Sequence, residues 1–135
     1  MKAVINTDLD GIKDLAASIA KNLKGGEIFA LIGALGAGKT TFVKALGKQL
    51  KLKRKITSPT FTLMHNFEAK VGAAKKKVFI YHLDLYRIKN FKETKALGIT
   101  QNWGRPDTIT IIEWADKIQK HLPAKTQIIK FKNNA

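Results

Sequence analysis

The chain has 135 residues, no cysteine, and 25 lysine and arginine residues against 10 aspartate and glutamate residues, which gives a formal net charge of +15. This length predicts one domain over residues 1–135 with a substantial hydrophobic core. The lack of cysteine excludes disulfides and thiolate metal sites. No run approaches the ~18 apolar residues of a membrane span and no signal peptide is visible, so we expect a soluble, cytoplasmic protein without membrane contact.

The positive charge predicts contact with nucleic acid or with an acidic partner, unless the lysines merely form a solvated surface. Only three of the basic residues are arginine, namely Arg54, Arg87 and Arg105. Arginine reads bases and phosphates better than lysine does. The composition therefore favours sequence-independent phosphate contact over sequence-specific recognition.

The N-terminal part of the chain is expected to contain an amphipathic helix. Apolar residues recur at helical spacing between residues 9 and 19, and Thr7 or Asp8 is placed to cap the first turn. Gly25 and Gly26 then favour a chain reversal. The pattern predicts a helix over residues 8–23.

A nucleotide-binding motif follows this helix. Residues 33–40 read Gly-Ala-Leu-Gly-Ala-Gly-Lys-Thr, which is the G-x-x-x-x-G-K-[ST] pattern of the P-loop. The apolar run 27–32 predicts a buried parallel strand, and residues 41–50 have apolar side chains at helical spacing. This strand–loop–helix order disfavours the alternative of a plain glycine-rich turn that begins a helix.

The residue types of the motif match phosphate and metal binding. The glycines let successive N–H groups point at phosphate oxygens, Lys39 reaches the β- and γ-phosphates, and the Thr40 hydroxyl ligates Mg²⁺. The expected nucleotide-binding residues are Leu35, Gly36, Ala37, Gly38, Lys39, Thr40 and Thr41.

The segment after the P-loop helix has two features of interest. A helix to residue 50 is about 18 Å long, so the basic run 51–55 is expected at the end of the domain away from the phosphates. This basic run is expected either to contact RNA or a partner protein, or to form a solvated loop. The following residues are long enough to return to the phosphate end, where the Thr60 hydroxyl would serve the metal or the γ-phosphate as a switch loop does.

The second half of the chain is expected to alternate strands and helix. The expected strands are 61–68, 77–85, 108–113 and 127–131, and a short helix over 90–97 is ended by Gly98. Together with the P-loop, these elements predict an α/β fold, a single P-loop NTPase-like domain with a mostly parallel central sheet and flanking helices.

Two carboxylates are expected beside the phosphates, because open α/β sheets bind ligands beyond the carboxyl ends of their strands. Glu113 ends an apolar strand in the manner of a Walker B acid, which holds Mg²⁺ through water or orients the attacking water. Asp84 is the second candidate acid. His82 shares a strand face with Asp84 and is more often structural in such a place. Arg87 would stabilise phosphate charge or pair with an acid.

Four motifs occur in order along the chain. They are Gly-Ala-Leu-Gly-Ala-Gly-Lys-Thr-Thr at 33–41, Ser-Pro-Thr-Phe-Thr-Leu at 58–63, His-Leu-Asp-Leu-Tyr-Arg at 82–87 and Ile-Glu-Trp at 112–114. In this set the chain resembles the TsaE family, the ATPase subunit of the bacterial machinery that makes threonylcarbamoyladenosine in tRNA. The resemblance covers most of residues 6–116.

The resemblance implies a weak, partner-dependent ATP hydrolase with ATP and Mg²⁺ as cofactors. Thr40 and Glu113 would hold the metal, Glu113, Asp84 and Thr60 would form the catalytic set, and Trp114 would lie near the nucleotide or a partner. The protein would bind a complex of TsaD-like and TsaB-like subunits and drive its turnover without transferring the threonylcarbamoyl group itself. The chain departs from the family in having Ala34 where an aspartate is usual and only one acid in residues 89–93.

Three other functions remain as alternatives. A small-molecule or nucleoside kinase needs an acceptor pocket and a lid with several arginines, and the chain has three arginines in all. A GTPase needs an Asn-Lys-x-Asp guanine-binding motif, which the sequence lacks. A nucleic-acid-binding module, possible on charge alone, would bind tRNA in a salt-dependent way without any partner.

Overall fold

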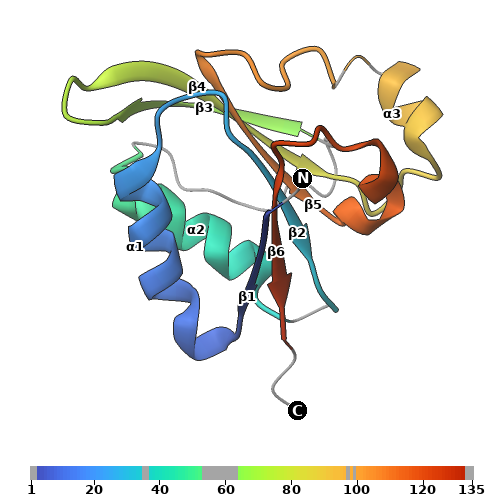
Figure 1. Ribbon diagram of the computed structural model, residues 1–135, viewed down its shortest axis with the longest axis horizontal. Helices are drawn as coiled ribbons and strands as arrows, with labels where there is room; N and C mark the ends of the chain where they lie inside the picture. The colour runs from blue at the N-terminus through green and yellow to red at the C-terminus, as the bar shows by residue number, and fades with distance from the viewer. Residues whose placement is uncertain (1–2, 35–36, 53–63, 97, 99, 133–135) are drawn as a thin grey trace.

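The computed structural model describes residues 3–34, 37–52, 64–96, 98 and 100–132. Six strands form one sheet in the order β1-β6-β2-β5-β4-β3 (Figure 1). They are β1 (Ala3–Thr7), β2 (Ile28–Ile32), β3 (Met64–Val71), β4 (Lys76–Asp84), β5 (Thr108–Glu113) and β6 (Gln127–Phe131). Neighbouring strands are parallel except β3 and β4, which form an antiparallel hairpin at one edge.

Helices cover both faces of the sheet. Successive side chains of a strand point to opposite faces, so the sheet contributes apolar side chains to two separate core clusters. On one face, Phe29 and Leu31 of β2 pack in the same core cluster as residues of α1 (Ile12–Asn22) and α2 (Lys39–Gln49). On the other face, Ile28 and Ala30 pack with residues of η2 (Ala115–His121) and α3 (Phe91–Ala96). None of the described helices is both long and apolar enough to cross a membrane.

The expected fold class and most expected elements are confirmed. The α/β architecture with a mostly parallel sheet is present, and the strands expected over 27–32, 77–85, 108–113 and 127–131 agree with β2, β4, β5 and β6 to within one residue at each end. The side chain of Asp8 accepts a hydrogen bond from the Gly11 backbone N–H at 3.0 Å and caps the short η1 turn (Leu9–Gly11) that precedes α1. The single domain stays a prediction.

Three elements differ from the expectation. β1 was not predicted, because this short strand depends on its parallel pairing with β6, more than 120 residues later in the chain. The strand expected over 61–68 continues to Val71, since β3 pairs with β4 to the end of the hairpin, and its residues 61–63 lie outside the described residues. η2 was also not predicted, and its interior is kinked at Ile118.

Candidate functional site

The carboxyl ends of three neighbouring strands meet beside the P-loop. The P-loop follows β2, and the strand register aligns Leu31 of β2 with Glu113 of β5 and Glu113 with Asp84 of β4. Glu113 therefore ends the central strand of the three. This is the sheet edge at which open α/β folds bind their ligands.

The start of α2 places Lys39 beside the P-loop. The helix begins at Lys39, and Gly38 before it has a φ of +109°, a left-handed conformation that glycine adopts without strain. A Cβ atom on Gly38 would lie 2.5 Å from the Cδ1 atom of Ile12. The close approach of α1 and the loop geometry therefore both require glycine at this position.

The Lys39 ammonium group is held by two contacts. Its Nζ atom donates a hydrogen bond to the Gly33 carbonyl oxygen at 2.7 Å and lies 3.4 Å from the ring centroid of Trp114, a cation–π contact. Burial lowers the pKa of Lys39, and the negative charges of Glu113, Asp116 and Asp84 oppose this shift. The ammonium group is thus withdrawn from water but surrounded by acids.

The Glu113 carboxylate is buried and hydrogen-bonded through both oxygens. Its Oε1 atom accepts a hydrogen bond from the Thr40 hydroxyl at 3.1 Å, and its Oε2 atom lies 2.5 Å from Nε2 of His82. Glu113 is 3% exposed and His82 is fully buried. Because a carboxylate only accepts hydrogen bonds, the His82 ring nitrogen is the donor in this pair.

The pair Thr40 and Glu113 fits a magnesium site of the P-loop type. The two side chains expected to serve the metal are in direct hydrogen-bond contact, although they are 73 positions apart in sequence. No group of three histidine, cysteine, aspartate or glutamate side chains in the described part of the chain could hold a metal by itself. A hydroxyl and a carboxylate oxygen are donors that Mg²⁺ combines with oxygen ligands from phosphate and water.

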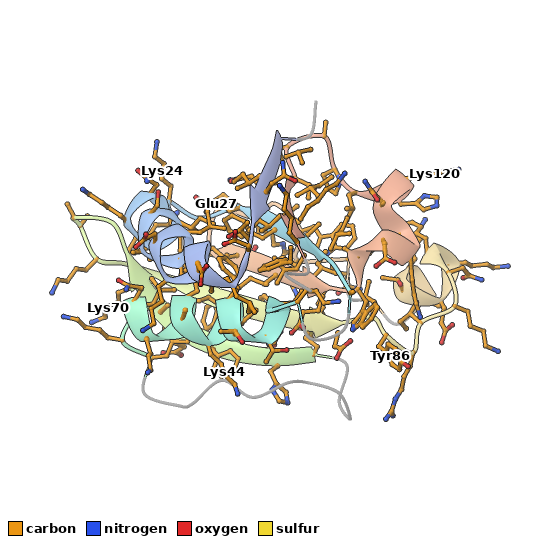
Figure 2. The ribbon with its side chains drawn as sticks, turned by 90° about the horizontal axis from the view of Figure 1, so that it is seen from below. Lys24, Glu27, Lys44, Lys70, Tyr86 and Lys120 are labelled. Atoms are coloured by element: carbon orange, nitrogen blue, oxygen red, sulfur yellow. The ribbon has the colours of Figure 1, made fainter. Side chains whose placement is uncertain are left out.

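Asp84 and Trp114 shape the rim of the site. Oδ1 of Asp84 accepts a hydrogen bond from the backbone N–H of Tyr86 at 3.0 Å, so this acid also orders the turn after β4. Trp114 follows Glu113 in a left-handed conformation (φ +60°), and its ring lies 5.1 Å from that of Tyr86. Tyr86 is 57% exposed and lies at the edge of the molecule in the view of Figure 2.

The structure brings together most of the expected site residues. Ala37, Gly38, Lys39 and Thr40 lie at the start of α2 beside Glu113, while Thr41 is exposed one residue further along the helix. Leu35, Gly36 and Thr60 lie outside the described residues. The roles expected for all of these residues stay predictions.

Two contacts of the site were not foreseen in the sequence. His82 was favoured as structural, but it contacts the carboxylate of Glu113; its position two residues before Asp84 on the same strand face was the available signal. The side chain of Lys117 donates a hydrogen bond to the Tyr86 carbonyl oxygen and so links η2 to the turn after β4. No sequence pattern indicated this second contact.

Comparisons with known proteins identify the family of the chain. The family model described as "Threonylcarbamoyl adenosine biosynthesis protein TsaE" matches residues 6–135. The chain is 40% identical over 119 residues to the tRNA threonylcarbamoyladenosine biosynthesis protein TsaE of Aquifex aeolicus, covering 87% of this chain and 79% of that protein. Its identity to the protein of the same name from Synechocystis is 36% over 121 residues, covering 87% and 72%.

A solved structure shares the fold. The crystal structure of Bacillus subtilis YdiB superposes with a TM-score of 0.64 at 28% sequence identity, and the match covers 95% of this chain and 75% of that chain. The family match spans the P-loop, the strand-end acids and almost all of the sheet. The chain therefore belongs to the TsaE family of threonylcarbamoyl adenosine biosynthesis proteins.

Proposed function

We propose that the protein is a Mg²⁺-dependent ATPase that acts in the threonylcarbamoyladenosine modification of tRNA in the cytoplasm. The observation that carries the proposal is the contact between the Thr40 hydroxyl and the buried carboxylate of Glu113, next to the P-loop lysine. The names of the relatives give the pathway. The P-loop, Thr40 and Glu113 supply the chemistry of an NTPase.

The chain's own residues have distinct tasks in this proposal. Lys39, now bonded to the Gly33 carbonyl oxygen, would place its charge on the β- and γ-phosphates of a bound nucleotide. The Thr40 hydroxyl and Glu113 would hold the metal, Glu113 through water or as the group that orients the attacking water, with Asp84 beside it. Bound Mg²⁺ neutralises charge that develops on the phosphate oxygens. Thr60 is proposed to complete the catalytic set.

We further propose that a complex of TsaD-like and TsaB-like subunits is the partner and that ATP turnover drives its cycle. A site completed only on assembly hydrolyses ATP slowly in isolation. The relatives' names place them in the biosynthesis of the modified nucleoside, and the four-motif resemblance to the TsaE family suggests that a separate subunit carries out the transfer. The protein would thus time another subunit's reaction.

The test combines the protein with the transferase pair and measures modified tRNA over many turnovers. Lys39→Ala is expected to lose both ATP binding and multiple-turnover modification. Lys44→Ala, on the exposed face of the same helix, should retain both. Undiminished multiple-turnover modification by a Lys39→Ala protein that no longer binds ATP would refute the proposal. Rapid hydrolysis by the isolated protein would refute its partner dependence.

A further inference from the structure

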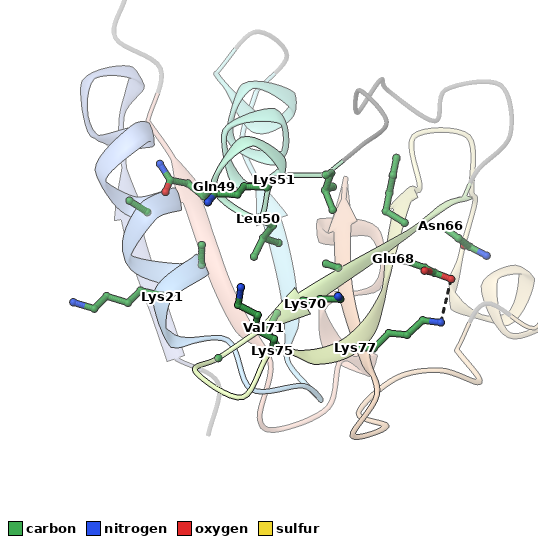
Figure 3. Close-up of a pocket in the computed structure, with 16 residues that line it drawn as sticks. Lys21, Gln49, Leu50, Lys51, Asn66, Glu68, Lys70, Val71, Lys75 and Lys77 are labelled. Carbon is green, nitrogen blue, oxygen red and sulfur yellow. Dashed lines mark ion pairs between the residues drawn. The ribbon is translucent and has the colours of Figure 1, made fainter.

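A second concave surface lies at the opposite end of α2 from the P-loop. It has a volume of about 1200 Å³ and is bounded by the C-terminal end of α2, one side of α1 and the β3–β4 hairpin (Figure 3). We call it the hairpin groove. Its charged lining residues are Lys21, Lys51, Lys70, Lys75, Lys77 and Glu68.

The charge of the hairpin groove is strongly one-sided. Five lysines and one glutamate give these residues a net charge of +4, and all six side chains are exposed. Glu68 pairs with Lys77 at 3.4 Å, whereas the other four lysines come from α1, the end of α2 and the hairpin. Clustered like charges repel one another, so a polyanion bound along the groove would relieve that repulsion.

The uncharged lining favours a nucleic acid over an acidic peptide. The β3 residues Phe67, Ala69 and Val71 line the groove but are buried, each less than 7% exposed. The large hydrophobic side chains that the described residues expose are Val4, Leu9 and Tyr86, and none of them lines the groove. Four other apolar side chains of the lining are only partly exposed, namely Ala17, Ala20, Leu50 and Leu52. A peptide-docking groove needs exposed apolar pockets for large anchor residues, whereas the lining side chains that are exposed here are the five lysines, Glu68, Gln49 and Asn66.

We propose that the hairpin groove binds the sugar–phosphate backbone of tRNA. Lysine ammonium groups contact phosphates as point charges and without base preference, so the lysines of the groove suit the backbone of an RNA and not its bases. The identification of the bound RNA as tRNA rests on the proposed function, whereas the binding of a polyanion rests on the charge of the groove alone. Because the groove and the P-loop lie at opposite ends of α2, tRNA bound there would leave the nucleotide site open.

The experiment measures how the binding of unmodified tRNA depends on salt. Fluorescence anisotropy of labelled tRNA is recorded between about 50 and 200 mM KCl, where phosphate contacts change affinity most clearly. The groove variant is Lys51→Gln/Lys70→Gln/Lys75→Gln. The matched control, Lys92→Gln/Lys95→Gln/Lys120→Gln, removes three exposed charges from α3 and η2; Figure 2 shows Lys70 and Lys120 at opposite ends of the molecule.

The groove variant is expected to weaken tRNA binding by about tenfold or more and to lower the slope of log K against log salt by about 2–3, since each lost phosphate contact removes about 0.7–0.9. The control should lower the slope by less than about 1. Equal losses in the two variants, or no binding by the wild type at low salt, would overturn the proposal. So would a groove variant that loses the transferase subunits but keeps tRNA, because the occupant is then an acidic protein.

Two further measurements separate this inference from folding and from the proposed function. Exposed Lys→Gln changes away from special backbone sites alter stability little, and equal ATP binding by the wild type and both variants would verify intact folds. A wild type that bound tRNA through the groove but did not support modification with the transferase pair would refute the proposed function while leaving the groove assignment standing.

Discussion

The hydrogen bond between His82 and Glu113 is expected to stabilise the fold measurably. His82→Leu removes the donor at 2.5 Å from Oε2 of Glu113 and leaves that oxygen, in a side chain that is 3% exposed, without this partner. A hydrogen bond to a charged group contributes about 1.5–3 kcal/mol. Leucine has a similar volume and adds little cavity or strain. We therefore expect the free energy of unfolding to fall by about 1.5–3 kcal/mol.

Denaturant unfolding at neutral pH measures this loss, and two further proteins identify its cause. His82→Gln keeps an N–H donor near the position of Nε2 and should recover much of the lost stability. In a Glu113→Gln background, His82→Leu should have a smaller effect, with a coupling energy of at least about 1 kcal/mol. Equal losses for His82→Leu and His82→Gln, together with no coupling to Glu113, would refute the reasoning and make His82 an ordinary core residue.

The same variants report on the orientation of Glu113 in the site. His82 and Thr40 bond the two carboxylate oxygens separately, so loss of the His82 bond frees the carboxylate to rotate. We expect His82→Leu, but not His82→Gln, to weaken Mg²⁺-dependent ATP binding, while ATP binding without Mg²⁺ stays the same. This difference distinguishes positioning of the metal site from a general loss of structure.

Further substitutions test three separate features. Burial lowers the pKa of Lys39 below its ordinary value of 10.5. Between the lowered pKa and pH 10.5 the unfolded chain therefore binds more protons at this residue than the folded chain does, so the wild type should gain stability relative to Lys39→Met as the pH rises through this range. A difference in denaturant midpoints that does not change with pH would contradict this. Thr40→Val should weaken Mg²⁺-dependent ATP binding by about tenfold, or about 1.4 kcal/mol, whereas Thr40→Ser retains it in calorimetric titrations. Gly25→Ala would place a Cβ atom 2.0 Å from the Pro106 carbonyl oxygen at a φ of +105° and should lower stability by about 2–4 kcal/mol in thermal unfolding. Gly72→Ala, at φ +74° with no atom within 4 Å, should lower it by only about 1–2 kcal/mol.

The elements predicted well are those with local signals. The P-loop strand and helix follow from a glycine pattern between an apolar run and helical spacing, all within 24 residues. Glu113 could be assigned to a strand end because a β-branched apolar run, residues 109–112, leads into the acid, and the structure buries all six residues of that strand. β1 has no such signal. Its five residues include Asn6 and Thr7, and it forms a strand through pairing with β6.

Four features could be derived from the amino-acid sequence alone: the P-loop, most of the strands and helices, the acids at the strand ends and the positive charge. These properties depend on residue types and on short-range spacing, which the chain carries before it folds. Which side chains meet across the sheet depends instead on how the elements pack in three dimensions. The parallel register of β4 and β5 brings His82 to Glu113, and the position of α2 brings Thr40 to the same carboxylate. The hairpin groove likewise exists only because α1, α2 and the β3–β4 hairpin pack together, since distant segments are brought together by burial of a shared apolar core and not by any local pattern.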